Sequence, residues 1–96
     1  MAKGDVTSGL SSVADASSLT IQPASGIEWV VHNIYHGGSV TVEKTDGTNN
    51  VTLASPDSDG ALSKYAWHVT NSEYVVVTNT SGGSVIIGYD GVVTAE

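Results

Sequence analysis

Residues 28–36 carry the run Glu-Trp-Val-Val-His-Asn-Ile-Tyr-His, which points to the fold class of the whole chain. The run is rich in β-branched and aromatic side chains, and both kinds are enriched in β-strands. Gly-Gly-Ser follows at residues 37–39, and paired glycines suit the positive φ angles of tight hairpins. This stretch therefore predicts a long β-strand that turns sharply at residue 37 into a further strand.

Segments of similar character lie on both sides of this run, separated by turn-forming residues. No segment after residue 18 shows the period of a helix. We therefore predict an all-β protein, a two-layer antiparallel β-sandwich of jelly-roll-like type with about seven strands. The expected strands cover residues 19–22, 28–36, 40–44, 51–54, 65–69, 74–79 and 85–89.

The chain contains one internal repeat. Residues 28–40 and 73–85 align without gaps and are identical at seven of thirteen positions, including the Glu-aromatic start and the Gly-Gly-Ser-Val end. The repeat predicts two pseudo-equivalent hairpins, placed one in each sheet or side by side. Convergence is the alternative, because many hairpins contain valine runs and glycine pairs.

Three of the expected strands carry apolar side chains on both faces. At residues 29–35, strict alternation sets Val30 and Ile34 on the face opposite Trp29, Val31 and Tyr35. Strands that are apolar on both faces are usually covered on both sides. A two-layer fold has no third layer, so we expect a partner or a symmetry mate to cover the outer face. The alternative is a scatter of exposed valines, which is common on protein surfaces.

The N-terminal segment differs in character from the rest. Residues 1–18 are mostly small and polar, and Val6, Leu10 and Val13 are spaced as in a helical turn. Chain termini are often loosely ordered. We therefore expect a flexible N-terminal arm over residues 1–18, which orders on a neighbour, followed by a β-sandwich domain over residues 19–96.

The charge balance excludes several classes of partner. Ten acidic residues face three lysines and no arginine, for a formal net charge of −7. Nucleic-acid binding depends on basic residues that neutralise phosphates, and an anionic membrane surface attracts cations in the same way. We expect no direct nucleic-acid or membrane partner. The start of the chain lacks the pattern of a secretory signal, so we expect synthesis in a cytoplasm.

The sequence shows no pattern typical of catalysis or metal binding. Cysteine is absent, and the histidines are His32, His36 and His68. His32 and His36 would lie about 13 Å apart along one strand, too far for one zinc ion whose ligands sit within about 2.1 Å of it. The chain contains no Gly-x-Ser-x-Gly motif. We expect no catalytic residue, no cofactor and no metal, and hence a protein that is not an enzyme.

Three stretches resemble short structural proteins of tailed bacteriophages. They are residues 27–35 (Ile-Glu-Trp-Val-Val-His-Asn-Ile-Tyr), residues 78–83 (Thr-Asn-Thr-Ser-Gly-Gly) and residues 87–91 (Ile-Gly-Tyr-Asp-Gly). Such proteins include head decoration (cement) proteins, which are small, β-rich and often trimeric. The resemblance implies a virion protein on the outer capsid surface, bound to the major capsid protein lattice as a homo-oligomer, with a trimer favoured. It assigns no functional residue.

We therefore expect a capsid decoration protein that stabilises the phage head through contacts between subunits. Two alternatives remain open: a tail, baseplate or fibre component, and a carbohydrate-binding or adhesive module that uses Trp29 and Tyr74. The residues expected at an interface are apolar and come from the N-terminal segment and the doubly apolar strands. They are Val6, Leu10, Val13, Trp29, Val30, Ile34, Tyr74, Val75, Val77 and Ile86.

Overall fold

A computed structural model describes residues 2–63 and 65–96, and β-strands make up most of this part of the chain. The nine strands are β1 (Val6–Val13), β2 (Ser18–Ile21), β3 (Glu28–His36), β4 (Val40–Thr45), β5 (Asn50–Ala54), β6 (Gly60–Leu62), β7 (Trp67–Val69), β8 (Tyr74–Asn79) and β9 (Val85–Ala95). Within the described ranges there is no helix of the length and apolarity that a membrane crossing requires.

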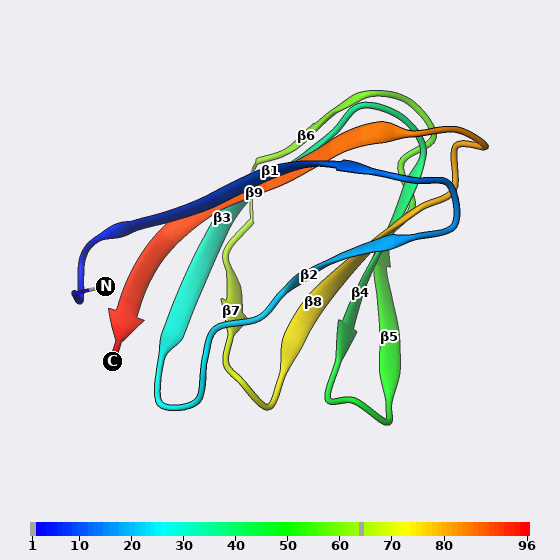
Figure 1. The fold of residues 1–96 in the computed structure, drawn as a ribbon. Helices are drawn as coiled ribbons and strands as arrows, with labels where there is room; N and C mark the ends of the chain where they lie inside the picture. The colour runs from blue at the N-terminus through cyan, green and yellow to red at the C-terminus, as the bar shows by residue number, and fades with distance from the viewer. Residues whose placement is uncertain (1, 64) are drawn as a thin grey trace.

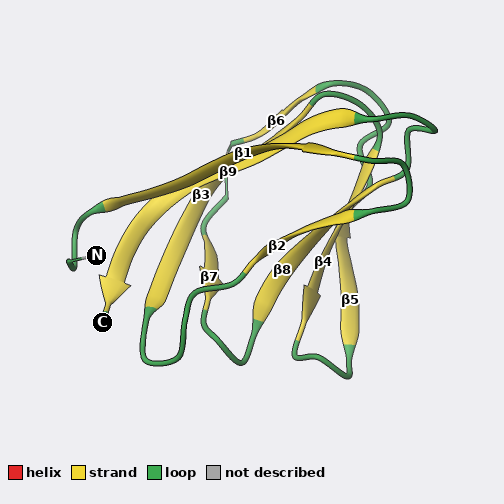
Figure 2. Cartoon of the chain, in the orientation of Figure 1, coloured by secondary structure: helices red, strands yellow, loops and turns green. Residues whose placement is uncertain are grey.

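The strands form two antiparallel sheets that pack face to face (Figures 1 and 2). Sheet A has the order β1-β9-β3-β6, and β7 also pairs with β3. Sheet B has the order β2-β8-β4-β5. The two chain ends lie close together at one end of the molecule in Figure 1. The predicted fold class, an all-β two-layer antiparallel sandwich, is confirmed.

The prediction of about seven strands is wrong, because two further strands are present. Residues 6–13, which we expected in a flexible arm, form β1 and pair with β9 along their whole length, from Val6↔Val92 to Val13↔Val85. Hydrogen bonds to β9, and not apolar side chains, keep this polar segment extended. Its composition therefore did not indicate a β-strand. The other addition is the short β6, which pairs with β3. β9 also runs to Ala95, beyond the expected end at residue 89.

The two repeat copies do not form hairpins. β3 lies in sheet A and continues into β4 of sheet B, whereas β8 lies in sheet B and continues into β9 of sheet A. β3 pairs with β9 and β4 pairs with β8. Each copy therefore crosses the sandwich, and its strands pair with those of the other copy. The prediction of hairpins is wrong because glycine-rich turns allow a sheet-to-sheet crossing as readily as a tight hairpin.

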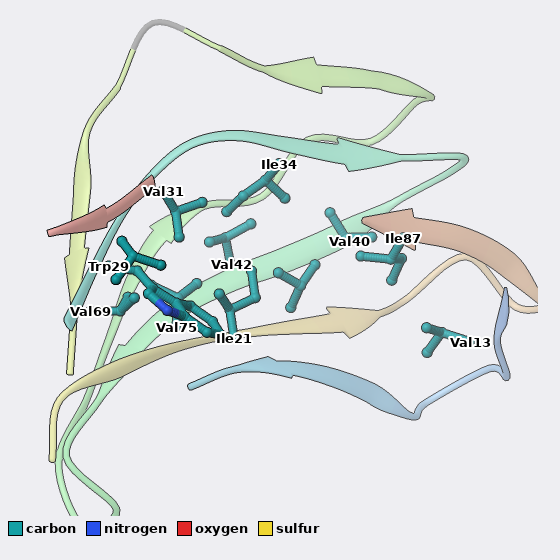
Figure 3. Close-up of a cluster of buried hydrophobic side chains, with 12 residues drawn as sticks. Val13, Ile21, Trp29, Val31, Ile34, Val40, Val42, Val69, Val75 and Ile87 are labelled. Carbon is teal, nitrogen blue, oxygen red and sulfur yellow. The ribbon is translucent and has the colours of Figure 1, made fainter. Parts of the chain in front are cut away.

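The core lies between the two sheets and consists mainly of valine and isoleucine (Figure 3). Sheet A contributes Val31, Ile34 and Ile87, which are fully buried, and Val42 and Val75 of sheet B face them. Trp29 adds the largest buried ring and stacks on Tyr89 at a centroid distance of 5.9 Å. Phenylalanine is absent from the chain, so β-branched side chains fill most of the interior.

A β-bulge in β3 changes which side chains point inward. Val31 pairs with Gly91 and Asn33 pairs with Asp90, so His32 is an extra residue between them. An extra residue reverses the alternation beyond it. Trp29 and Val31 point inward before the bulge, and Ile34 and His36 are buried after it. The expectation that Val30 and Ile34 share one face is therefore wrong.

Candidate interaction surface

The outer face of sheet A carries exposed apolar side chains from three adjacent strands. The solvent-exposed fraction is 70% for Val6 and Leu10 of β1, 48% for Ile86 of β9 and 37% for Tyr35 of β3. Val30 and Val92 lie on the same face and are half-buried. We call this surface the sheet A face and define it by these six residues.

Strand register brings these side chains into rows across the sheet. One row contains Val6, Val92 and Val30, because Val6 pairs with Val92 and Val92 with Val30. A second row joins Leu10, Gly88 and Tyr35 in the same way. Side chains in such rows are direct neighbours, so residues from both ends of the sequence form one surface.

Gly88 lets Leu10 lie close against the sheet in the second row. A Cβ atom on Gly88 would come within 2.5 Å of Leu10 Cδ1 and 2.6 Å of the Gly9 carbonyl oxygen. Any larger residue at this position would have to displace both the Leu10 side chain and the β1 backbone. The absence of a side chain at Gly88 therefore allows the Leu10 side chain to cover β9 between β1 and β3.

A small polar network lies in the middle of this face. Asn33 Nδ2 donates to Asp90 Oδ1 at 2.6 Å, and the Tyr35 hydroxyl donates to Asp90 Oδ2 at 2.5 Å. Because the β-bulge reverses the alternation of β3, it turns Asn33 and Tyr35 outward, toward Asp90 of the neighbouring strand. Both oxygens of the carboxylate thus accept a hydrogen bond from within the protein.

These hydrogen bonds shift two pKa values in opposite directions. The hydrogen bond from Tyr35 is the largest cause of a lowered pKa at Asp90; the Asn33 bond and the nearby His32 lower it further, while burial opposes them. The same bond raises the pKa of Tyr35, because it stabilises the protonated phenol beside a carboxylate. Asp90 is therefore a satisfied carboxylate rather than a proton donor near neutral pH.

The outer face of sheet B has a different character. Its half-buried side chains include Glu43 and Val76, and most of the others carry hydroxyls. Ser18 and Thr78 share a hydrogen bond of 2.8 Å across two of its strands. The hydroxyl-bearing residues of this face include Ser18, Thr20, Thr41, Thr52 and Thr78. Of the two outer faces, the sheet A face is thus the more apolar one.

The structure divides the residues predicted for an interface into three groups. Val6, Leu10, Val30 and Ile86 come together on the sheet A face. Tyr74 is half-buried in sheet B. The remaining five lie in the core and present no side chain to a partner of the folded protomer; they are Val13, Trp29, Ile34, Val75 and Val77.

Tyr35, Asp90 and Val92 also lie on or within the sheet A face and were not among the residues predicted for an interface. Strict alternation placed Tyr35 with Trp29 and Val31, and only the bulge turns it to the outside. Asp90 and Val92 lie beyond the expected end of the last strand. The valine pair at residues 92–93 was the available signal for a longer strand.

The proposed sugar platform of Trp29 and Tyr74 is not formed. Stacking on a sugar requires an exposed aromatic face, whereas Trp29 is only 8% exposed and packs on Tyr89. Its indole N–H is buried with no hydrogen-bond partner among the described residues. Trp29 is thus a core residue.

Other surface features carry little chemistry. One shallow depression is lined by Lys44, Asp46, Val51 and Glu73, among others, and a second by the loops at residues 25–28 and 70–72. Within residues 2–63 and 65–96, no group of three histidine or acidic side chains is placed to hold a metal ion.

No protein-family model matches the chain. A relative from a tailed virus is 36% identical over 91 residues, and the match covers 80% of this chain and 77% of the relative. Together with the fold, this similarity defines a β-sandwich protein of tailed viruses. The relative is Gp30 of Haloferax tailed virus 1, and the chain belongs to the same family as Gp30.

Proposed function

We propose that the protein is a non-enzymatic structural component of a tailed-virus particle, and that it decorates the outer surface of the head. Its membership of the Gp30 family supports a virus-related role. The observation that carries the finer assignment is the sheet A face, which exposes four apolar side chains on one side of a small domain. Contiguous exposed apolar surface on a soluble domain marks an interaction site.

The face suits binding to a lattice of other proteins. Its apolar side chains can be buried against a neighbour, and the Asp90 carboxylate among them is already hydrogen-bonded by Asn33 and Tyr35. Burying this face thus leaves few polar groups without partners, which limits the cost of desolvation. In this proposal the partner is the major capsid protein, and many copies add buried area that resists the outward pressure of packaged DNA.

The charge of the chain is consistent with a place outside the shell. At a net charge of −7 the protein is repelled by the phosphates of packaged DNA. A net charge this far from zero also favours solubility before assembly. A head protein and a tail protein would share both properties, so the location of this protein needs a separate measurement.

Copy number in purified virus particles tests the location. We expect the protein in a fixed, high ratio to the major capsid protein, measured by quantitative mass spectrometry. Cryo-electron microscopy of the same particles should show its density on the outside of the head. A few copies per particle, with density on the tail or baseplate, would assign it to the tail instead.

A pair of matched variants tests the surface. Ile86→Glu places a charge in the sheet A face, and Thr20→Glu adds the same charge to the outer face of sheet B. We expect the first variant to lose occupancy on particles stripped of the protein, and the second to bind as the wild type does. Equal binding by both would exclude the sheet A face as the docking surface.

A further inference from the structure

The outermost strand of sheet A, β1, has an unusually open edge. β1 pairs with β9 on one side, and no described strand pairs with its other side. Its eight residues keep an unbroken register with β9 from Val6 to Val13. The other edge strands of the described chain are shorter, with three to five residues, and β5 contains a register shift against β4. β1 thus lacks the short length and the bulge that normally protect edges.

The backbone groups of β1 alternate in the direction they point. The Val93 N–H donates to the Asp5 carbonyl at 2.9 Å, so the carbonyl of Asp5 points toward β9. In an antiparallel ladder every second residue does the same. Val6, Ser8, Leu10 and Ser12 therefore direct their N–H and C=O groups toward the open edge. These four residues are also exposed.

The charge of the chain limits what can bind along this edge. Two copies at −7 each repel one another over most of their surfaces, yet residues 6–14 carry no charged side chain. Asp5 and Asp15 lie just outside this stretch. The β1 edge is thus a place where a second copy of this acidic chain can approach without bringing carboxylates together.

We propose that β1 pairs with β1 of a second copy, antiparallel and centred on Ser8, so that sheet A continues across a two-fold axis. An antiparallel pair of identical strands is self-complementary. The Ser8-centred register places Val6 opposite Leu10 of the second copy, and Leu10 opposite its Val6. It is the one register that sets the two exposed apolar residues of β1 against each other.

The pairing has two consequences for the molecule. It joins the sheet A faces of two protomers into one apolar surface of twice the area. This consequence is the same whether the protein binds the head or the tail of the virus particle. It also defines a two-fold dimer, in contrast to the trimer that the resemblance to decoration proteins favoured. Asp5 would lie opposite Ser11 of the second copy, so no two aspartates face each other.

The mass of the full chain in solution, measured by light scattering over a range of concentrations, is the first test. We expect a dimer with twice the chain mass of 9.8 kDa. Leu10→Lys should raise the dimer dissociation constant by about tenfold or more, because it sets a charge opposite an apolar side chain in the new pair. Val51→Lys makes the same charge change on β5, where Val51 is 62% exposed, and should leave the dimer intact.

Cross-linking tests the register itself, because the chain has no cysteine of its own. In the proposed pair the two Ser8 Cα atoms lie about 5.5 Å apart, within disulfide reach. The two Ser12 residues lie about 26 Å apart. Ser8→Cys should therefore form disulfide-linked dimers under mild oxidation, whereas Ser12→Cys should not. A monomer or a trimer at all concentrations, or cross-linking by Ser12→Cys alone, would overturn the proposal.

Discussion

At the scale of single residues, Asn79 is the polar side chain that ties one end of the sandwich together. It is fully buried at the end of β8. Its Nδ2 donates to the Val13 carbonyl at 2.9 Å and to the Gly83 carbonyl at 2.6 Å. Its Oδ1 accepts from the backbone N–H and the hydroxyl of Ser81. One amide thus connects β1, β8 and the turn into β9.

Replacing Asn79 should be costly for this reason. Asn79→Ala removes all four of these hydrogen bonds, including the buried one to the Val13 carbonyl, and we expect it to lower the free energy of unfolding by about 3 kcal/mol. Asn50→Ala, at an exposed position, should change it by less than about 0.5 kcal/mol. Chemical denaturation followed by tryptophan fluorescence measures both. Similar values for the two variants would show that the Asn79 network contributes little.

Asp90 should make stability depend on acid. Its pKa is lowered in the folded protein, chiefly by the Tyr35 hydroxyl. A lowered pKa adds stability at pH values above the unfolded pKa, near 3.8, and this stability is lost as the pH falls through the folded value. We expect wild-type protein to be more stable than Asp90→Asn at neutral pH, with the difference shrinking as the pH falls below about 4.

The matched control for this pH effect is Asp59→Asn, which removes the same charge from an exposed loop. Its stability relative to the wild type should show little pH dependence of this kind. The test is to measure the unfolding free energies of the wild type and both variants at several pH values between neutral and strongly acidic. Parallel curves for Asp90→Asn and wild type would mean that the Tyr35–Asp90 contact contributes nothing to folding.

At the scale of elements, the bulge in β3 depends on a glycine in the strand beside it. Gly91 pairs with Val31 just before the extra residue His32. A Cβ atom on Gly91 would collide with the Val30 carbonyl oxygen and lie 2.7 Å from Val31 Cα. Both obstacles are backbone atoms, so no side-chain rotation relieves them. The close approach of β3 and β9 thus requires glycine at this position.

Gly91→Ala should therefore destabilise the sandwich by about 2–3 kcal/mol, the usual cost of forcing extra volume into a packed site. Gly83→Ala is the matched control, because a Cβ there would meet nothing within 4 Å. We expect the control to stay within about 0.5 kcal/mol of wild type. Denaturant midpoints measure the two variants side by side. A tolerant Gly91 would mean that β3 and β9 are less tightly joined than the register indicates.

At the scale of the whole molecule, the net charge of −7 on 96 residues opposes folding. Excess charge of one sign repels itself in the compact state. Salt shortens the Debye length from about 30 Å at 0.01 M to about 3 Å at 1 M. We therefore expect the thermal midpoint to rise as sodium chloride increases over this range.

A variant with less charge tests whether this repulsion is the cause. Asp57→Asn, Asp59→Asn and Glu96→Gln together change the formal charge from −7 to −4, and all three positions are exposed. This variant should be more stable at low salt and should respond less to added salt. An unchanged salt response would point to an effect of salt on apolar burial instead.

The sequence by itself determined the class of the fold, the position of most strands and turns, and the acidic surface. Strand character and turn chemistry are local, so runs such as residues 28–36 and their glycine-rich borders reveal them. Four of the ten predicted interface residues, Val6, Leu10, Val30 and Ile86, do meet on one face. Val6 and Leu10 were predicted from a helical spacing in an expected arm, and they reach this face because β1 is a strand paired with β9.

Only the tertiary structure decided the sheet to which each strand belongs and the direction in which its side chains point. β1 is a strand because β9 supplies its hydrogen bonds, whatever its own composition. Ile34 points inward because a one-residue bulge opposite Gly91 reverses the alternation, which no count along the sequence reveals. Pairing and bulges are set by contacts between residues far apart in the chain, and these contacts create the sheet A face.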